Sequence, residues 1–180
     1  MSMSESWQTA EIPGPIKTVV IPEAKRVAAI LKSAKRLLLI VGNEIIKQQD
    51  SEFDIVQYIT EIAKATNAHI NVTGTIIHEF REKGYDKVFL MPALEIVDRL
   101  RDETWMGHDN AGRYTLAVFM GFPYYYEWLL LNGMKHFAYK NMKTLSLDPH
   151  YQPNATFSLP NMRIDEWRKF IRELVESLRR

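Results

Sequence analysis

An uninterrupted apolar run from Leu37 to Val41 constrains the fold more than any other segment of the chain. Two basic residues precede the run and Gly42 closes it. A continuous run of this kind is typical of a strand buried on both faces, as in a parallel sheet covered by helices. Such sheets bind ligands beyond the carboxyl ends of their strands, so Gly42 and Asn43 mark the place where a site is expected.

A dinucleotide fingerprint is missing at this position. The fingerprint requires two further glycines within the next five residues, and residues 43–47 contain none. The segment therefore predicts the fold class without predicting a nicotinamide or flavin dinucleotide as cofactor.

Strands and helices are expected to alternate along the rest of the chain. Helical periodicity is found at about 22–34, 53–66, 92–100 and 164–178, with a short helix that ends near residue 83 and another that begins near Pro123. In the helix after Pro123, the apolar side chains expected to face the sheet include Leu129 and Leu130. Strands are expected at 69–72, 88–91, 114–121 and 143–147, with a possible edge strand at 16–21. This alternation predicts a Rossmann-like α/β fold, in which helices cover both faces of a parallel sheet of five or six strands.

Length and composition narrow the possible functions. The 180 residues suit one domain, expected at 16–180, after a flexible amino-terminal arm at 1–15. With 23 basic and 22 acidic side chains, no net field favours nucleic acid or an anionic membrane. The absence of cysteine excludes thiolate nucleophiles and the usual iron–sulfur ligands, and the five histidines show no metal-ligand spacing. Neither a long apolar segment nor a signal peptide is recognisable, which predicts a cytoplasmic protein.

The predicted strand ends supply the candidate binding residues. They are Gly42, Asn43, Gly74, Thr75, Gly121 and Asp148. Backbone amides at glycine turns can hold phosphates, and a carboxylate at a strand end can hold ribose hydroxyls, so the set could form a nucleotide cleft. The alternative is that the glycines only permit tight turns and that Asp148 begins a turn before Pro149. Both interpretations remain open at the level of the sequence.

Two other groups of residues have a functional and a structural interpretation. The pair His108-Asp109 could be a polarised imidazole, or part of a solvated loop at 104–113. The run Tyr124-Tyr125-Tyr126 with Trp128 could pack in the core, form an interface or stack on a flat cofactor. Trp7 and Trp105 favour the interface. No nucleophile, base and metal set is recognisable, which argues against a free-standing enzyme.

Five segments carry a resemblance to a known family, in a fixed order and spacing. They are the helix and strand at 22–42, the strand at 68–74, the motif Trp105-x-Gly107-x-Asp109-x-x-Gly112-x-Tyr114, Gly121 with Tyr124-Tyr125, and Thr144-x-Ser146-x-Asp148-x-x-Tyr151-x-x-Asn154-Ala155 with Ser158 and Asn161. From about Lys17 to Leu178 the chain resembles the epsilon subunit of the archaeal acetyl-CoA decarbonylase/synthase complex, the smaller partner in its carbon monoxide dehydrogenase component.

The resemblance implies a fold like the DHS-like NAD/FAD-binding domain and a non-catalytic role. The expected partner is the large alpha subunit, which holds the nickel and iron–sulfur centres for CO oxidation and reversible acetyl-CoA cleavage in archaeal one-carbon metabolism. The chain would stabilise that subunit and form a homo-oligomer when isolated. The alternative role is an electron-transfer module that binds FAD or a nucleotide. Glu44 stands where the family more often has a second glycine, and its charge would oppose a phosphate.

Overall fold

The computed structural model describes residues 14–180 of the chain. The arm expected at residues 1–15, with Trp7, lies almost entirely outside the described residues. The expected single domain begins within them.

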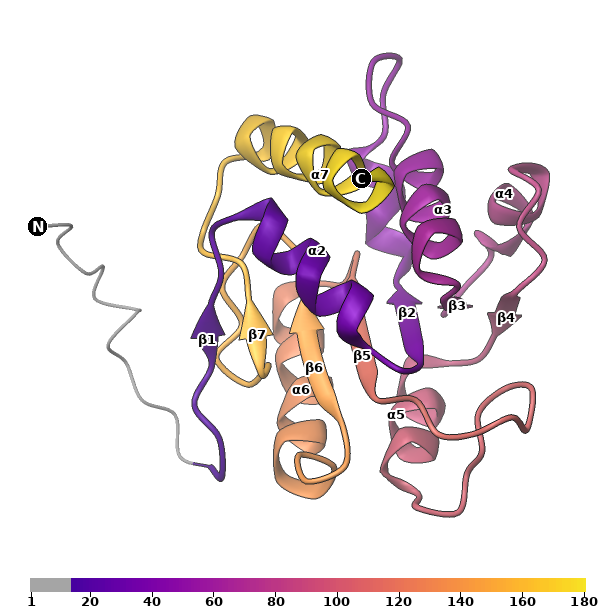
Figure 1. The fold of residues 1–180 in the computed structure, drawn as a ribbon, viewed down its shortest axis with the longest axis vertical. Helices are drawn as coiled ribbons and strands as arrows, with labels where there is room; N and C mark the ends of the chain where they lie inside the picture. Colours follow the sequence, from indigo (N-terminus) through magenta and orange to yellow (C-terminus); the bar gives the residue numbers. More distant parts are fainter. Residues whose placement is uncertain (1–13) are drawn as a thin grey trace, which may run out of the picture.

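Seven parallel strands form one sheet in the order β1-β7-β6-β5-β2-β3-β4 (Figure 1). Their bounds are β1 Val19–Val20, β2 Leu37–Val41, β3 His69–Val72, β4 Val88–Leu90, β5 Leu116–Met120, β6 Lys143–Ser146 and β7 Phe157–Ser158. The Rossmann-like parallel α/β fold is thereby confirmed, with seven strands where five or six were expected. The additional strand is β7, which is too short to produce a recognisable pattern and is defined by its pairing with β1 and β6.

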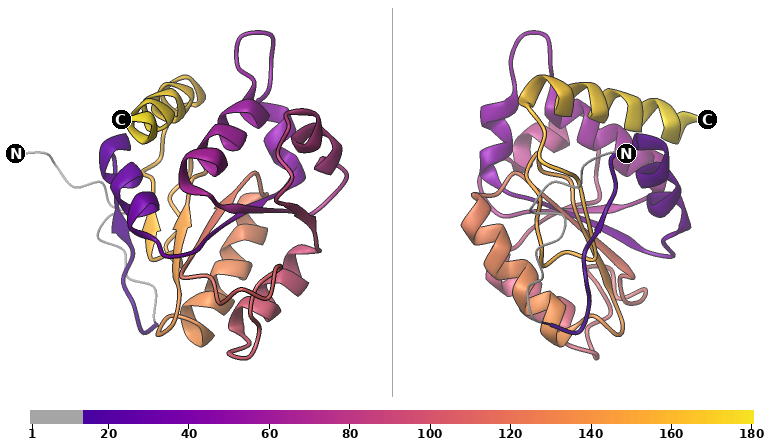
Figure 2. Two further views of the ribbon diagram at one scale, coloured as in Figure 1. Left: turned by 45° about the vertical axis from the view of Figure 1, so that its right-hand side comes forward. Right: turned by 90° about the vertical axis from the view of Figure 1, so that its left-hand side faces the viewer.

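Helices cover both faces of the sheet (Figures 1 and 2). The helices on one face are α2 Ala24–Ser33, α3 Ile55–Thr66, α4 Ile77–Glu82 and α7 Ile164–Arg179, and those on the other are α5 Ala93–Arg101 and α6 Tyr124–Phe137. A short 3-10 helix, η1 Asn43–Gln48, follows β2 and was not expected from the sequence. Its three-residue repeat and brief length give no amphipathic pattern.

The apolar run that predicted the fold is buried on both sides, as expected. Leu37, Leu39 and Val41 of β2 belong to the core beneath α2, α3 and α7. Leu38 and Ile40 belong to the core beneath α5 and α6. Because successive strand residues point to opposite faces, one strand contributes to both cores, and each such side chain contributes about 1.5 to 3 kcal/mol on full burial.

Local signals define α3 at both ends. The Asp54 side chain accepts a hydrogen bond from the backbone N–H of Gln57 at 3.0 Å, which satisfies a free donor of the first turn. Asn67 ends the helix in the left-handed conformation, with a φ of 54°. The strand β3 then begins two residues later, at His69.

Candidate functional site

The carboxyl ends of the central strands meet along one edge of the sheet. Val41 at the end of β2 pairs with Val72 of β3 and with Met120 of β5, and Phe119 of β5 pairs with Ser146 of β6. The residues that follow these ends include Gly42, Gly74, Gly121 and Asp148, which therefore share this carboxyl edge. The structure thus brings together most of the residues that the sequence selected.

Protein atoms fill the space between Gly42 and Gly121. The Gly42 N–H donates to Met120 O at 2.9 Å, and the Glu44 N–H donates to Gly121 O at 3.0 Å. A Cβ at Gly42 would lie 2.2 Å from Gly121 O, which no side chain could tolerate. Gly121 itself has a φ of +77°, in the region that favours glycine. These two glycines are needed for the close approach of the β2 and β5 turns.

The next strand end is closed in the same way. A Cβ at Gly74 would lie 2.2 Å from Nδ2 of Asn43, so the Asn43 side chain rests against the Gly74 backbone. Thr75 is exposed beside it. Glu44 is half-buried, and its carboxylate forms an ion pair with Lys47 at 2.5 Å.

The side chain of Asp148 accepts hydrogen bonds from backbone N–H groups that could otherwise bind an anionic ligand. Its buried carboxylate accepts from the Gly121 N–H, at 2.7 Å from Oδ1 and 3.0 Å from Oδ2, and from the Phe122 N–H at 3.3 Å. Two consecutive backbone N–H groups before a helix are a typical anion site. Here a carboxyl group of the chain itself takes this position.

A second acid, Glu127 of α6, faces Asp148 from inside the protein and is only 1% exposed. Gln152 Nε2 donates to Glu127 Oε2 at 3.2 Å and to Tyr124 O at 3.1 Å. Burial, followed by the charge of Asp148, raises the pKa of Glu127 well above its usual range. Burial also raises the pKa of Asp148, against the opposing effect of the Gly121 and Phe122 amides. Glu127 was not among the candidate residues predicted from the sequence, although a lone acid within Tyr124–Leu131 is a visible signal.

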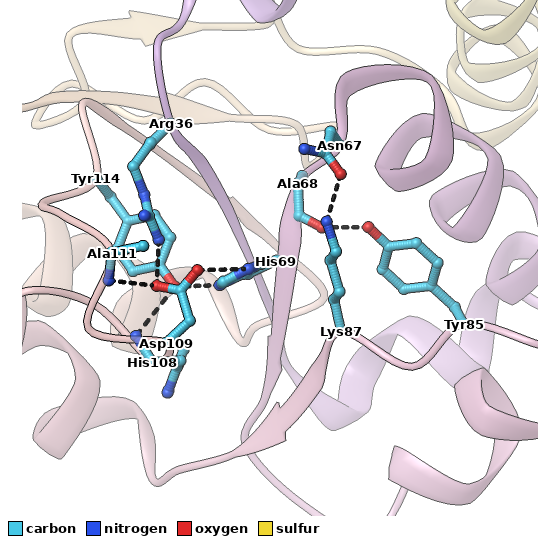
Figure 3. Close-up of polar contacts among 10 residues, drawn as sticks. All are labelled: Arg36, Asn67, Ala68, His69, Tyr85, Lys87, His108, Asp109, Ala111 and Tyr114. Atoms are coloured by element: carbon cyan, nitrogen blue, oxygen red, sulfur yellow. Dashed lines mark hydrogen bonds and ion pairs between the residues drawn. The ribbon is translucent and has the colours of Figure 1, made fainter.

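The opposite edge of the sheet carries a polar cluster, shown in Figure 3. His69 begins β3, and its Nδ1 lies 2.6 Å from the Tyr114 hydroxyl, while its Nε2 lies 3.5 Å from Asp109 Oδ2. Asp109 also binds Arg36 at 2.6 Å and accepts from the Ala111 N–H at 3.1 Å. The cluster therefore joins the segments before β2, β3 and β5 through one carboxylate.

His108 packs as a structural side chain rather than as a solvated one. Its ring stacks on Phe89, with centroids 4.2 Å apart and an interplanar angle of 3°, and Trp105 meets its edge. Burial, followed by the charge of His69, lowers the pKa of His108 to about 4. The adjacent Asp109 pairs with Arg36 and His69. The pair proposed from the sequence is thus divided between two sets of contacts.

A polar cavity of about 150 Å³ adjoins this cluster, lined in part by Arg36, His69, Lys87 and Asp109. Burial is the main cause that lowers the pKa of His69, and Arg36 and Lys87 act in the same direction against Asp109. Lys87 donates to Asn67 at the carboxyl end of α3, where a cation offsets the helix dipole. Lys87 therefore stabilises the carboxyl end of α3, and Arg36 stabilises the loop that contains Asp109.

Helix α6 exposes several large apolar side chains. Of its two charged residues other than histidine, Glu127 is 1% exposed and lies against Gln152, and Lys135 is 2% exposed and lies against the segment at Gly14. Its exposed side chains include Tyr125, Leu129 and Phe137, at 70%, 56% and 68%. The expectation that Leu129 faces the sheet is wrong, because Leu130, Leu131 and Met134 take the inward positions.

Two structural features are absent from residues 14–180. No described helix is long and apolar enough to cross a bilayer. Within the same residues, no group of three or more histidine, aspartate or glutamate side chains is arranged to hold a metal ion.

Comparison with known proteins identifies relatives over nearly the whole chain. A family model described as CO dehydrogenase beta subunit/acetyl-CoA synthase epsilon subunit matches residues 2–175. The acetyl-CoA decarbonylase/synthase complex subunit epsilon of Methanothermobacter thermautotrophicus is 28% identical over 168 residues, 93% of this chain and 92% of the relative. Subunit epsilon 1 of Archaeoglobus fulgidus is 31% identical over 157 residues, 86% and 82% of the two chains. Subunit epsilon 1 of Methanosarcina barkeri is 30% identical over 151 residues, 84% of each chain.

Proposed function

Because the chain belongs to the CO dehydrogenase beta subunit/acetyl-CoA synthase epsilon subunit family, we propose that it serves as the accessory epsilon subunit of an acetyl-CoA decarbonylase/synthase complex. In this role it binds the large alpha subunit that carries the nickel and iron–sulfur centres, and stabilises it during CO oxidation and acetyl-CoA cleavage. The chain itself performs no chemical step. The complex is expected to work in the cytoplasm.

The main structural support for this proposal is that the chain's own atoms fill the space at the carboxyl edge of the sheet. Proteins with this fold bind nucleotides beyond the strand ends, where free backbone amides face the phosphates. In this chain the Asp148 carboxylate holds the amides of Gly121 and Phe122, and the Gly42 and Gly121 backbones fill the adjacent space. A fold whose usual ligand site is filled by its own residues supports a structural role in a complex.

The alternative is an electron-transfer module that binds FAD or a nucleotide at Gly42, Asn43, Gly74, Thr75, Gly121 and Asp148. A pyrophosphate at these residues would have to displace Asp148 from its hydrogen bonds and approach the Glu44 carboxylate. Two like charges a few ångströms apart cost on the order of 1 to 4 kcal/mol near a protein surface. We therefore propose that the chain has no intrinsic cofactor.

Co-expression with the large subunit from the same organism tests the accessory role. The chain is expected to co-purify with the large subunit at a fixed ratio and to raise the temperature at which that subunit loses CO oxidation activity. A large subunit with the same yield and thermal inactivation in the absence of the chain would contradict the proposal.

Titration of the isolated chain with FAD, followed by flavin fluorescence, tests the alternative. We expect no binding below millimolar concentrations. Submicromolar binding would favour the electron-transfer role.

A further inference from the structure

We propose that a pocket at the amino edge of the sheet binds a small organic anion, which has an apolar body and a phosphate or carboxylate group. The pocket has a volume of about 370 Å³ and lies where β5 and β6 begin, between the carboxyl ends of α2 and α6. It is separate from the closed carboxyl edge. The proposal goes beyond the accessory role and does not depend on it.

The inner walls of this pocket are apolar. Leu116 of β5 and Met142 before β6 line it and are only 3% and 5% exposed. The half-buried side chains of Ile30, Tyr139 and Phe157 complete the apolar lining. Concave sites of about 300 to 1,000 Å³ with apolar walls and a few polar groups are typical of small-molecule binding. An inorganic ion would leave most of these walls in contact with water, so the ligand is expected to have an apolar body.

Three lysines give the pocket its charge. Lys35, Lys140 and Lys143 all line it, and none of its lining residues is acidic. Within residues 14–180, none of the three forms an ion pair with a carboxylate. Lys140 Nζ lies 5.9 Å from the centroid of the Tyr139 ring. Lys143 Nζ lies at the same distance from the centroid of the Phe157 ring. Cations and aromatic walls are therefore adjacent, as recognition of an organic anion requires.

Negative groups near the pocket reduce this charge without cancelling it. The carboxyl ends of α2 and α6 each present about half a negative charge. A cation at each helix end offsets these charges, which accounts for Lys35 and Lys140. Outside the lining, exposed Glu103 accepts a hydrogen bond from Asn141 Nδ2 at 2.7 Å. Lys143 begins β6 and has no helix end to offset. The pocket thus keeps a positive potential, which a concave surface concentrates and which favours an anion.

The probe is α-naphthyl phosphate, which joins an aromatic body to a phosphate group, and its binding to the full chain is followed by fluorescence anisotropy. Lys140→Ala combined with Lys143→Ala removes two of the three cations. Lys25→Ala combined with Lys169→Ala is the control, because it removes two exposed lysines of α2 and α7 with the same change in net charge. The first pair should weaken binding at least tenfold and the control less than twofold. Thermal unfolding verifies that each variant folds.

Two competitors show which part of the ligand is recognised. Inorganic phosphate should compete at least tenfold more weakly than α-naphthyl phosphate. Equal competition would indicate an adventitious ion only and would overturn the proposal. Tighter binding of hexaglutamate would identify an acidic peptide segment as the occupant, which also overturns it. The proposal is equally wrong if the unaltered chain does not bind the probe at millimolar concentrations, or if both pairs of substitutions weaken binding alike.

Discussion

The carboxylate of Asp148 accepts the backbone N–H of Gly121 through both oxygens, at 2.7 and 3.0 Å. This relationship joins the end of β6 to the turn after β5. It also decides the character of the carboxyl edge, because an acid of the chain holds backbone amides that would otherwise be free to bind an anion.

Replacement of Asp148 by alanine tests the importance of this contact for stability. The buried N–H groups of Gly121 and Phe122 would lose their acceptor, and each unsatisfied group costs about 1 to 3 kcal/mol. We expect urea denaturation to give a free energy of unfolding about 2 kcal/mol lower. Asp86→Ala, at an exposed position, is the control and should change stability little. Equal effects of the two changes would show that the contact is not stabilising.

The raised pKa of Glu127 predicts that the free energy of unfolding changes with pH above the acid range. Its pKa is raised in the folded protein, mainly by burial and then by Asp148, so folding favours the protonated form. The associated stabilisation is complete below the unfolded pKa, about 4.3, and is lost as the pH rises through the folded pKa. Relative to Glu127→Gln, the unaltered chain should therefore lose stability as the pH rises above about 4.3. Unfolding free energies across this range, with Glu176→Gln as an exposed control, provide the measurement; a constant difference would contradict the prediction.

The lowered pKa of His108 predicts the opposite pH dependence, a stability that decreases as the pH falls. Its pKa falls from 6.5 to about 4, chiefly through burial, so the folded state favours the neutral ring. Stability is then lost as the pH falls from about 6.5 towards 4. His108→Phe keeps the stacking on Phe89 and should remove this dependence, while His78→Phe at an exposed position should keep it. Identical acid unfolding profiles for the two variants would argue against this role of His108.

Alanine substitutions at Gly42 and Gly133 compare a glycine at a close backbone contact with a glycine that has space for a side chain. Gly42→Ala places a Cβ 2.2 Å from Gly121 O, and the required shift should cost about 1 to 3 kcal/mol or more. Gly133→Ala in α6 finds its nearest atom at 3.9 Å and should stabilise the helix by about 0.5 to 1 kcal/mol. Thermal unfolding of both variants is the measurement. A neutral Gly42→Ala would mean that the two turns can separate without cost.

The polar cluster at the amino edge is tested by Tyr114→Phe. The change removes the hydroxyl that contacts His69 Nδ1 at 2.6 Å and accepts the His108 N–H at 3.3 Å. A loss of about 1 to 3 kcal/mol is expected from the unsatisfied buried partners. Tyr125→Phe, at an exposed hydroxyl, should have no measurable effect on the stability of the isolated chain. If the two tyrosines behave alike in urea denaturation, the cluster contributes nothing to stability.

Elements that depend on a local pattern of residues could be predicted from the amino-acid sequence. The bounds of β3, His69–Val72, agree with the expected strand, and the apolar run at Leu37–Val41 is buried on both faces as predicted. Periodicity and capping residues act over a few positions, so they can be recognised in one segment at a time. The positions of Gly42, Gly74, Gly121 and Asp148 at one edge also followed, because parallel strands end on the same side.

The contacts that these residues make could not be predicted from the sequence. Gly121 and Asp148 are 27 residues apart, and their hydrogen bonds depend on the pairing of β5 with β6. Helix α6 is apolar on several sides, so periodicity could not show that Leu129 faces outward and Glu127 inward. His69, Arg36 and Asp109 meet because three strands begin beside one another. Contacts between distant segments depend on register and packing, which no local pattern specifies.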